Sequence, residues 1–300
     1  MEYFIELCSS GLVRGSIYAL IALGYTMVYG IIQLINFAHG EIYMIGAFTA
    51  LIVAGVLTIY GFSGVSILIL AALIAAIYAA AYGYTLEKIA YRPLRNAPRL
   101  SALISAIGMS LFLQNYVLLA QTPDFLPFPS LIPDFAFMEP IAHIMGSAEL
   151  VILVTSAVTM VALTVLIKYT RIGKAMRATQ QDMTMARLVG VNVDNVISMT
   201  FVIGSVMAAI GGVLVASYIG QINFYIGFMA GIKAFTAAVL GGIGNIPGAV
   251  LGGMVLGLAE SFATGYVSSA YEDVFAFGVL VLILVLRPSG LLGKAITQKV

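Results

Sequence analysis

Long apolar segments are the feature that most limits what this chain can fold into. Of its 300 residues, 61% are hydrophobic and only 9% are charged. A helix of about 20 apolar residues spans the ~30 Å of hydrocarbon in a bilayer, and several runs here approach that length. We therefore predict an all-α polytopic membrane protein with eight to nine spans. The segments are residues 11–35, 40–60, 65–86, 100–120, 149–167, 196–219, 228–243, 249–266 and 274–286.

Charged residues between the segments predict the orientation of the chain. Four basic residues lie in 87–99, and five of the fourteen basic residues lie in 168–195. The tail after residue 286 is also basic, whereas 121–148 carries three acidic residues and no Lys or Arg. Because basic loops stay in the cytoplasm, we expect these three basic stretches there and 121–148 on the outer side. Nine crossings satisfy every loop, with the N-terminus outside and the C-terminus in the cytoplasm.

The segment 228–243 is the weakest of the predicted spans, because it is short and contains Lys233. We expect a broken or tilted helix there. Glu260, in the next segment, falls at a similar depth on an antiparallel neighbour, so the two charges are candidates for an intramembrane pair. The alternative is that Lys233 reaches the outer interface while Glu260 contacts water.

The polar stretch 168–195 contains a signal for a short helix. Asp182 can cap its N-terminus, residues 183–189 include good helix formers, and Gly190 can end it. The stretch lies between two apolar segments, and its charges exclude it from lipid. We therefore predict a loop in water that carries one short helix.

That short helix would present apolar side chains to the aqueous phase. Met185, Leu188 and Val189 share one face, since their spacing is three and four residues. Exposed apolar groups of this kind favour docking to another protein. The alternative is a surface helix that lies on its own membrane domain.

An internal repeat relates two parts of the chain at an offset of 187 residues. Residues 35–50 and 222–237 share nine identities over sixteen positions. The copies lie five crossings apart, so they have opposite orientations, as in the inverted repeats of transporters. We predict one transmembrane domain over 1–300, with halves at about 11–167 and 196–290. Coincidence of apolar composition is the alternative explanation.

Each copy of the repeat begins with polar residues. The first contains Asn36, His39 and Glu41, and the second contains Asn223. Amide and acid groups at a helix start inside a membrane could hydrogen-bond a solute, so these four are candidates for a translocation pathway. The alternative for Asn36 and Asn223 is that they cap interfacial turns.

The sequence carries no recognisable catalytic constellation. Its two histidines, His39 and His143, fall on opposite sides of the predicted membrane, and no metal-ligand spacing is visible. It has no phosphate-binding loop, so any ATP hydrolysis belongs to another polypeptide. The net charge of +1 predicts no nucleic-acid partner. We expect a protein that is not an enzyme and holds neither a metal nor a cofactor.

Several longer motifs resemble one family of membrane proteins. They are NFAHGEIYMIGAF at 36–48, AYRPLR at 90–95, LISAIGMSLFLQN at 103–115, FYIGFMAGIKAFTAAVLGGIGNIPGA at 224–249 and RPSGLLG at 287–293. Together they resemble the high-affinity branched-chain amino acid permeases of ABC importers, LivH type, over essentially the whole chain.

The resemblance implies a subunit of the bacterial inner membrane that imports leucine, isoleucine or valine. Its partners would be a homologous second permease of the LivM type, two cytoplasmic ATPase subunits and a periplasmic binding protein, which places the N-terminus in the periplasm. Two alternatives remain. One is an ABC permease for urea, amides or other amino acids, and the other is a stand-alone secondary transporter. Few carboxylates lie inside the segments, which counts against proton coupling.

The resemblance also assigns a role to the stretch 168–195. Importer permeases carry an E-A-A-x-x-x-G loop that docks the ATPase, and residues 184–190 stand in that place. Ala186 and Gly190 match the pattern, while its Glu is absent. The predicted ATPase-coupling residues are Asp182, Met185, Ala186, Leu188 and Gly190.

Overall fold

The computed structural model describes residues 2–95, 97–135 and 145–293, and most of these residues are helical. The long and short helices are α1 Glu2–Ile32, α2 His39–Ile59, α3 Val65–Leu86, α4 Arg99–Ala120, α5 Ser147–Tyr169, α6 Arg171–Gln181, α7 Met183–Leu188, α8 Val193–Ile219, α9 Ile226–Gly241, α10 Ile246–Tyr266 and α11 Glu272–Leu286. The π-helical turn η1 (Glu87–Tyr91) and the 3₁₀ turns η2 (Arg92–Leu94) and η4 (Ser269–Tyr271) join them. Two short strands, β1 (Leu126–Pro127) and β2 (Gln221–Ile222), pair antiparallel.

Eight helices of the described chain are long and apolar enough to cross a membrane. The helix α9 has only 16 residues and is excluded from that set, which agrees with the weak span expected at 228–243. It follows the irregular residues 223–225, which continue from the strand β2. The all-α multi-pass fold is therefore confirmed, with eight long helices and one short one.

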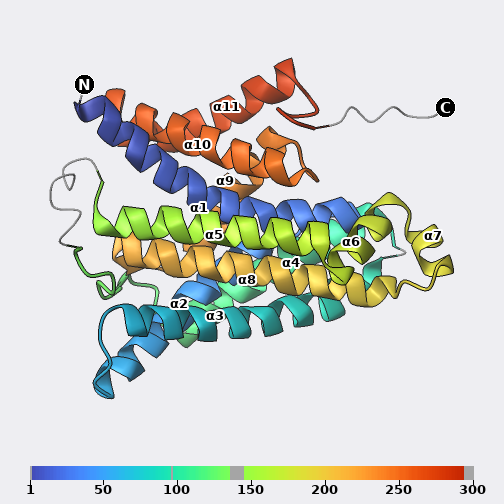
Figure 1. Cartoon of the computed structure of the whole chain (residues 1–300), viewed down its shortest axis with the longest axis horizontal. Coiled ribbons are helices and arrows are strands. Elements are labelled where there is room, and N and C mark those ends of the chain that lie inside the picture. The colour runs from blue at the N-terminus through green and yellow to red at the C-terminus, as the bar shows by residue number, and fades with distance from the viewer. Residues whose placement is uncertain (1, 96, 136–144, 294–300) are drawn as a thin grey trace.

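Contacts between loops show which of them share an end of the molecule. Arg92 Nη2 lies 3.0 Å from Asp194 Oδ2, which joins η2 to the start of α8. The amide of Leu291 in the tail donates to the carbonyl of Leu240 at the end of α9, at 2.9 Å. The stretches 87–99 and 168–195 and the described start of the tail lie at one end, which we call the inner end. The strands β1 and β2 lie at the opposite, outer end, and Figure 1 shows α6 and α7 projecting at the inner end.

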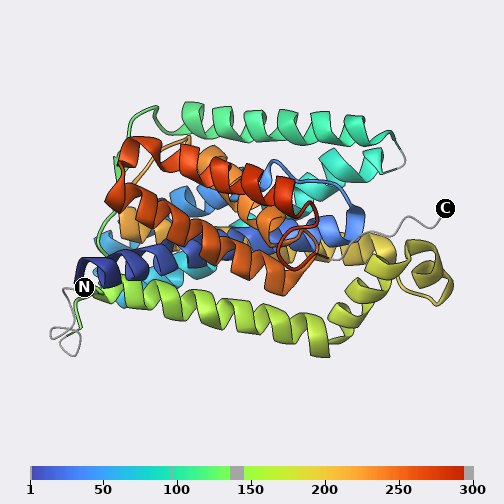
Figure 2. The same cartoon turned by 90° about the horizontal axis from the view of Figure 1, so that it is seen from above.

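The helices α1 and α8 are the most deeply buried, and each of them packs on a helix of the opposite predicted half. α1 packs on α10, and α8 packs on α3, while α2 crosses α9. The first contact is very close, since a Cβ added at Gly257 would overlap the backbone of Gly15. This exchange is the pattern expected of the predicted repeat, in which α1 and α8 are equivalent. Figure 2 shows α4 and α5 on opposite flanks of the bundle.

The first helix begins earlier than the predicted boundary at residue 11. It starts at Glu2, because Tyr3 and Phe4 pack on the end of α10, where their rings lie 5.9 and 5.5 Å from those of Tyr266 and Phe262. Aromatic packing, rather than apolar length alone, extends the helix. It ends three residues before the predicted boundary at 35, and the next residue, Gln33, has a φ of 54°.

The stretch 168–195 was predicted as a loop with one short helix, and this is wrong for its first half. α6 occupies Arg171–Gln181, and Thr170 caps it by accepting a hydrogen bond from the amide of Gly173 at 3.0 Å. Its buried positions, Gly173, Met176 and Thr179, recur every three residues. That spacing is a helical signal, but it is masked by the polar residues between.

Candidate functional site

The short helix α7 has the local structure that its sequence predicts. Asp182 Oδ1 accepts hydrogen bonds from the amides of Thr184 at 2.7 Å and Met185 at 3.0 Å. Gly190 follows the helix with a φ of 87°, a left-handed conformation that a residue with a Cβ rarely adopts. Both ends of α7 are therefore fixed by single residues.

The exposed face of α7 is apolar. Met185 is 60% exposed and Leu188 is 75% exposed, and Val189 just after the helix is 77% exposed. Ala186 is buried instead, and its carbonyl accepts the amide of Val191 at 3.0 Å. These exposed side chains belong to a helix that projects beyond the end of the bundle (Figure 1).

The break between α1 and α2 holds Asn36 in a buried position. Its Oδ1 accepts a hydrogen bond from the Tyr91 hydroxyl at 3.0 Å, and the same hydroxyl lies 3.3 Å from the carbonyl of Ile35. The carbonyl of Asn36, not its side chain, accepts the amide of His39 at 3.0 Å. The side chain of Asn36 therefore ties the break to η1 and does not cap α2.

The break before α9 is held differently. Asn223 Oδ1 accepts the amide of Tyr225 at 3.1 Å, and the carbonyl of Asn223 accepts the amide of Ile226 at 3.3 Å. This is a local turn made by one side chain with its own backbone. The two asparagines that match in the repeat are therefore bound to different elements.

The matched glycines of the repeat meet where α2 crosses α9. A Cβ on Gly40 would overlap the carbonyl of Gly227, and it would also crowd Gly231. Each of the two matched glycines is the second residue of its helix. The first turns of the two helices therefore press against each other, and the polar residues beside Gly40 lie at the crossing.

His39 and Glu41 flank this crossing on opposite sides of α2. The His39 ring is buried against α1, edge-on to Tyr25 at 4.8 Å between ring centroids, and a Cβ added at Gly24 would fall on it. Glu41 faces α4 and α9 instead, and its Oε1 accepts from the Ser110 hydroxyl at 3.0 Å. His39 Nε2 and Glu41 Oε2 are buried without a hydrogen-bond partner among the described residues.

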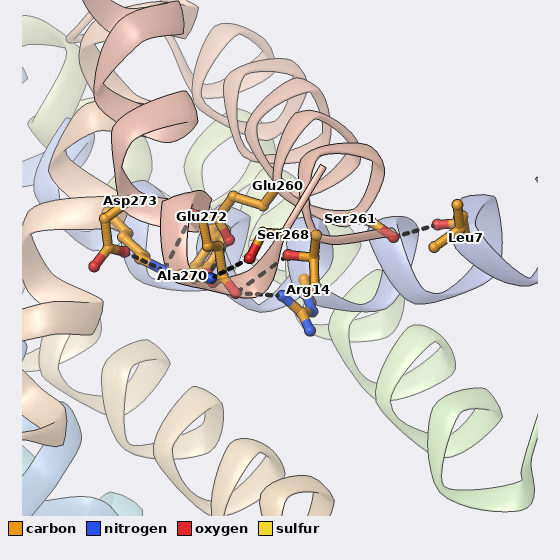
Figure 3. A network of polar contacts seen from close by, with 11 residues as sticks. Leu7, Arg14, Glu260, Ser261, Ser268, Ala270, Glu272 and Asp273 are labelled. Carbon is orange, nitrogen blue, oxygen red and sulfur yellow. Dashed lines mark hydrogen bonds and ion pairs between the residues drawn. The ribbon is translucent and has the colours of Figure 1, made fainter. Parts of the chain in front are cut away.

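The structure brings Lys233 and Glu260 together. Figure 3 shows Glu260 within a larger group of charges that includes Arg14, Glu272 and Asp273. Lys233 Nζ lies 3.3 Å from Glu260 Oε1, 2.7 Å from Glu272 Oε1 and 2.9 Å from Asp273 Oδ1. The hydrogen bond of Lys233 goes to Glu272, so the contact with Glu260 is the weaker one. Arg14 completes the group with an ion pair to Glu272 at 3.1 Å. We call these five residues the outer cluster.

The comparison with known proteins decides the family. The family described as "Branched-chain amino acid transport system / permease component" matches residues 7–284. The chain belongs to this family of permease components. It is 49% identical to LivH of Escherichia coli strain K12, a high-affinity branched-chain amino acid transport system permease protein, over 99% of this chain and 98% of that protein. BraD of Pseudomonas aeruginosa, a permease protein of the same description, gives the same identity and coverage.

A more distant relative matches only part of the permease. LsrC of Yersinia enterocolitica, an autoinducer 2 import system permease protein, is 34% identical over 47% of this chain and 40% of that protein. The full-length matches therefore assign this chain as a non-catalytic, multi-pass component of the bacterial inner membrane.

A second group of charges lies at the inner end of the permease. Arg95 contacts both Glu87 and Asp194, and Arg92 contacts Asp194 at 3.0 Å. Ser198 donates a hydrogen bond from its hydroxyl to Glu87 Oε2 at 2.6 Å. We call Glu87, Arg92, Arg95 and Asp194 the inner cluster. The sequence places Asp194 in a different loop from the other three, so only the folded chain reveals that they meet.

Sequence reasoning also missed three members of the outer cluster. Arg14, Glu272 and Asp273 lie far from Lys233 in sequence. Within the described residues, no three His, Cys, Asp or Glu side chains lie close enough to hold a metal ion. His143 lies outside the described residues, as does the basic tail from 294 to 300.

Proposed function

We propose that this permease carries branched-chain amino acids into the cytoplasm as one membrane subunit of an ABC importer. The observation that supports this most is similarity over nearly the full length to LivH and BraD, two permeases of branched-chain amino acid transport systems. Its partners are a second permease of the LivM type, two cytoplasmic ATPase subunits and a periplasmic binding protein. ATP hydrolysis takes place in the ATPase subunits.

We infer that α7 is the contact with an ATPase subunit. Its apolar residues Met185 and Leu188 are exposed at the end that carries the basic stretches. Burying each side chain in a groove of the partner would contribute about 1–3 kcal/mol to the interface. Asp182 and Gly190 fix the two ends of the helix, so the apolar face is held ready before the partner arrives.

We infer that the substrate passes the crossing of α2 and α9. Glu41 Oε2 is a buried acceptor beside Gly227, and a carboxylate of this kind can bind the ammonium group of an amino acid. The aliphatic side chain needs apolar walls, and Met44, one turn along α2, packs against the same glycine. His39, Asn36 and Asn223 remain candidates for the route on either side of the crossing.

One reconstitution tests the proposal. The permease, its partner permease and both ATPase subunits are reconstituted in proteoliposomes. The binding protein and leucine, isoleucine or valine are enclosed in the lumen. Complexes inserted with their ATPase subunits outside the vesicle then have their outer end facing the binding protein. Addition of ATP outside should drive export from the vesicle that depends on the binding protein and exceeds that of urea or acetamide. Transport of urea alone would assign another solute. Leucine movement without ATPase subunits would indicate a secondary transporter.

The variant Met185→Asp with Leu188→Asp should abolish substrate-stimulated ATP hydrolysis in the same vesicles, because charge replaces the apolar contact. The matched control is Arg187→Gln, which changes the same helix without removing an apolar side chain. Normal stimulation in the double variant would contradict docking through α7.

A further inference from the structure

We propose that η1 is a coupling element, which carries movement of the ATPase-docking helix α7 to the break between α1 and α2. This inference rests on the proposed function, because it needs an ATPase at α7 and a substrate route at the start of α2. It is built from a continuous series of polar contacts that joins these two regions. The series crosses from the second half of the permease to the first.

The first step joins α7 to α8. Only residues 189–192 separate the two helices, and Asn192 caps α8 by accepting the amide of Asn195 at 3.1 Å. The carbonyl of Ala186 in α7 holds the amide of Val191 at 3.0 Å. A displacement of α7 therefore pulls directly on the first turn of α8, where Asp194 lies.

The second step joins α8 to η1 through the inner cluster. Asp194 binds Arg92 and Arg95, and Arg95 also binds Glu87, the first residue of η1. Glu87 is fully buried, and its other oxygen accepts the hydroxyl of Ser198 on the next turn of α8. Two separate contacts therefore link Glu87 to α8, and a shift of that helix changes both of them.

The third step joins η1 to the break. Tyr91, the last residue of η1, is buried, and its ring centroid lies 5.0 Å from that of Phe201 in α8. Its hydroxyl donates to Asn36 and lies within reach of the carbonyl of Ile35. The carbonyl of Asn36 holds the amide of His39, the first residue of α2. The contacts thus end at the turn that carries His39 and Glu41.

The turn η1 is the element of this series that we expect to switch between two patterns of backbone hydrogen bonding, π-helical and α-helical. A π turn makes i→i+5 hydrogen bonds and is an insertion into an otherwise α-helical run, frequently at functional sites. Return to α-helical bonding would release one residue and shift Tyr91 relative to Glu87. Coupling between distant sites requires a discrete change of this kind, and a row of contacts alone does not supply it.

The test uses two tyrosine substitutions that each remove one hydroxyl and keep the ring. Tyr91→Phe breaks the contact with Asn36, whereas Tyr18→Phe, the matched control, breaks the 2.7 Å hydrogen bond to Glu260 in the outer cluster. In the reconstituted complex, the ratio of leucine transported to ATP hydrolysed should fall about two- to tenfold in Tyr91→Phe. This fold-change corresponds to the net free energy of one hydrogen bond. The ratio should stay unchanged in Tyr18→Phe.

A double variant and a conformational measurement complete the test. Tyr91→Phe combined with Asn36→Leu should lower the ratio no further than Asn36→Leu alone, because both remove the same contact. Hydrogen exchange at residues 87–91 should change when the ATPase is trapped with vanadate, and exchange at 220–225 should change less. An unchanged ratio in Tyr91→Phe, or equal exchange changes in the two segments, would overturn the proposal. Absence of ATP-dependent leucine transport in the wild type would instead reject the proposed function.

Discussion

The two ends of the permease use charge in different ways. In each cluster, the first helix of one predicted half contacts the turn that follows the third helix of the other half. The outer cluster joins α1 to the region where α11 starts, and the inner cluster joins α8 to the region of η1 and η2. Each cluster holds a fully buried carboxylate, Glu260 in the outer cluster and Glu87 in the inner one. The ion pairs at the two rims differ, because the side chains of Arg14 and Glu272 are 31% and 23% exposed, whereas those of Arg92 and Asp194 are both 42% exposed.

This difference indicates different roles for the two ends. Removing one partner from a buried ion pair leaves an uncompensated charge, so the outer cluster acts as a fixed fastening between helices. The rim of the inner cluster, Arg92 and Asp194, is exposed to solvent and lies beside the docking helix. Water can therefore replace a contact that is lost there. The breaks differ in the same way, since the side chain of Asn36 at the inner end binds Tyr91, whereas the side chain of Asn223 binds its own backbone.

The largest expected effect is at the outer cluster. Lys233→Met should lower the free energy of unfolding by about 3–5 kcal/mol, because it strands Glu260 in the bundle. Adding Glu260→Gln should recover part of that loss, since Glu272 keeps its contact with Arg14 and Asp273 is half exposed. Unfolding in mixed micelles with increasing dodecyl sulfate measures both variants. Losses that simply add would show that the two residues are independent.

This pair also shows how far the sequence could predict the structure. The spans follow from apolar length, and the cap at Asp182 follows from neighbours two and three residues away, so both are local. Lys233 and Glu260 were placed at similar depth by counting along antiparallel helices. Arg14 was missed because it lies 258 residues from Glu272, and nothing in the sequence states that α1 packs on α10.

The repeat shows the same limit at the level of single residues. Asn36 and Asn223 stand in the same Ile-Asn-Phe triplet, so the sequence gives them equivalent roles. Their partners differ because Tyr91 is brought to Asn36 from 55 residues away by the turn η1. A shared motif predicts a shared backbone position, whereas the hydrogen-bond partner depends on tertiary packing.

An intermediate effect is expected where the breaks are compared. Asn36→Leu should lower the free energy of unfolding by about 1–3 kcal/mol, because it leaves the buried Tyr91 hydroxyl without its side-chain acceptor. Asn223→Leu removes one local hydrogen bond and should lower it by about 0.5–1.5 kcal/mol. The same dodecyl sulfate titration measures both variants. Equal losses would mean that the two ends hold their breaks in the same way.

The smallest expected effect is at the rim of the inner cluster. Arg92→Met removes one of the two arginines on Asp194, and the exposed carboxylate keeps Arg95 and water as partners. The melting temperature of the purified permease should therefore stay unchanged within error, at low salt and at high salt. The matched substitution at the outer end is Arg14→Met, which removes one of the two cations that contact Glu272. Because Glu272 is about half as exposed as Asp194, this substitution should lower the melting temperature measurably. If Arg92→Met lowered it as much as Arg14→Met does, the inner rim would be as rigid as the outer cluster. Residues beside the docking helix could then not exchange their partners freely with water.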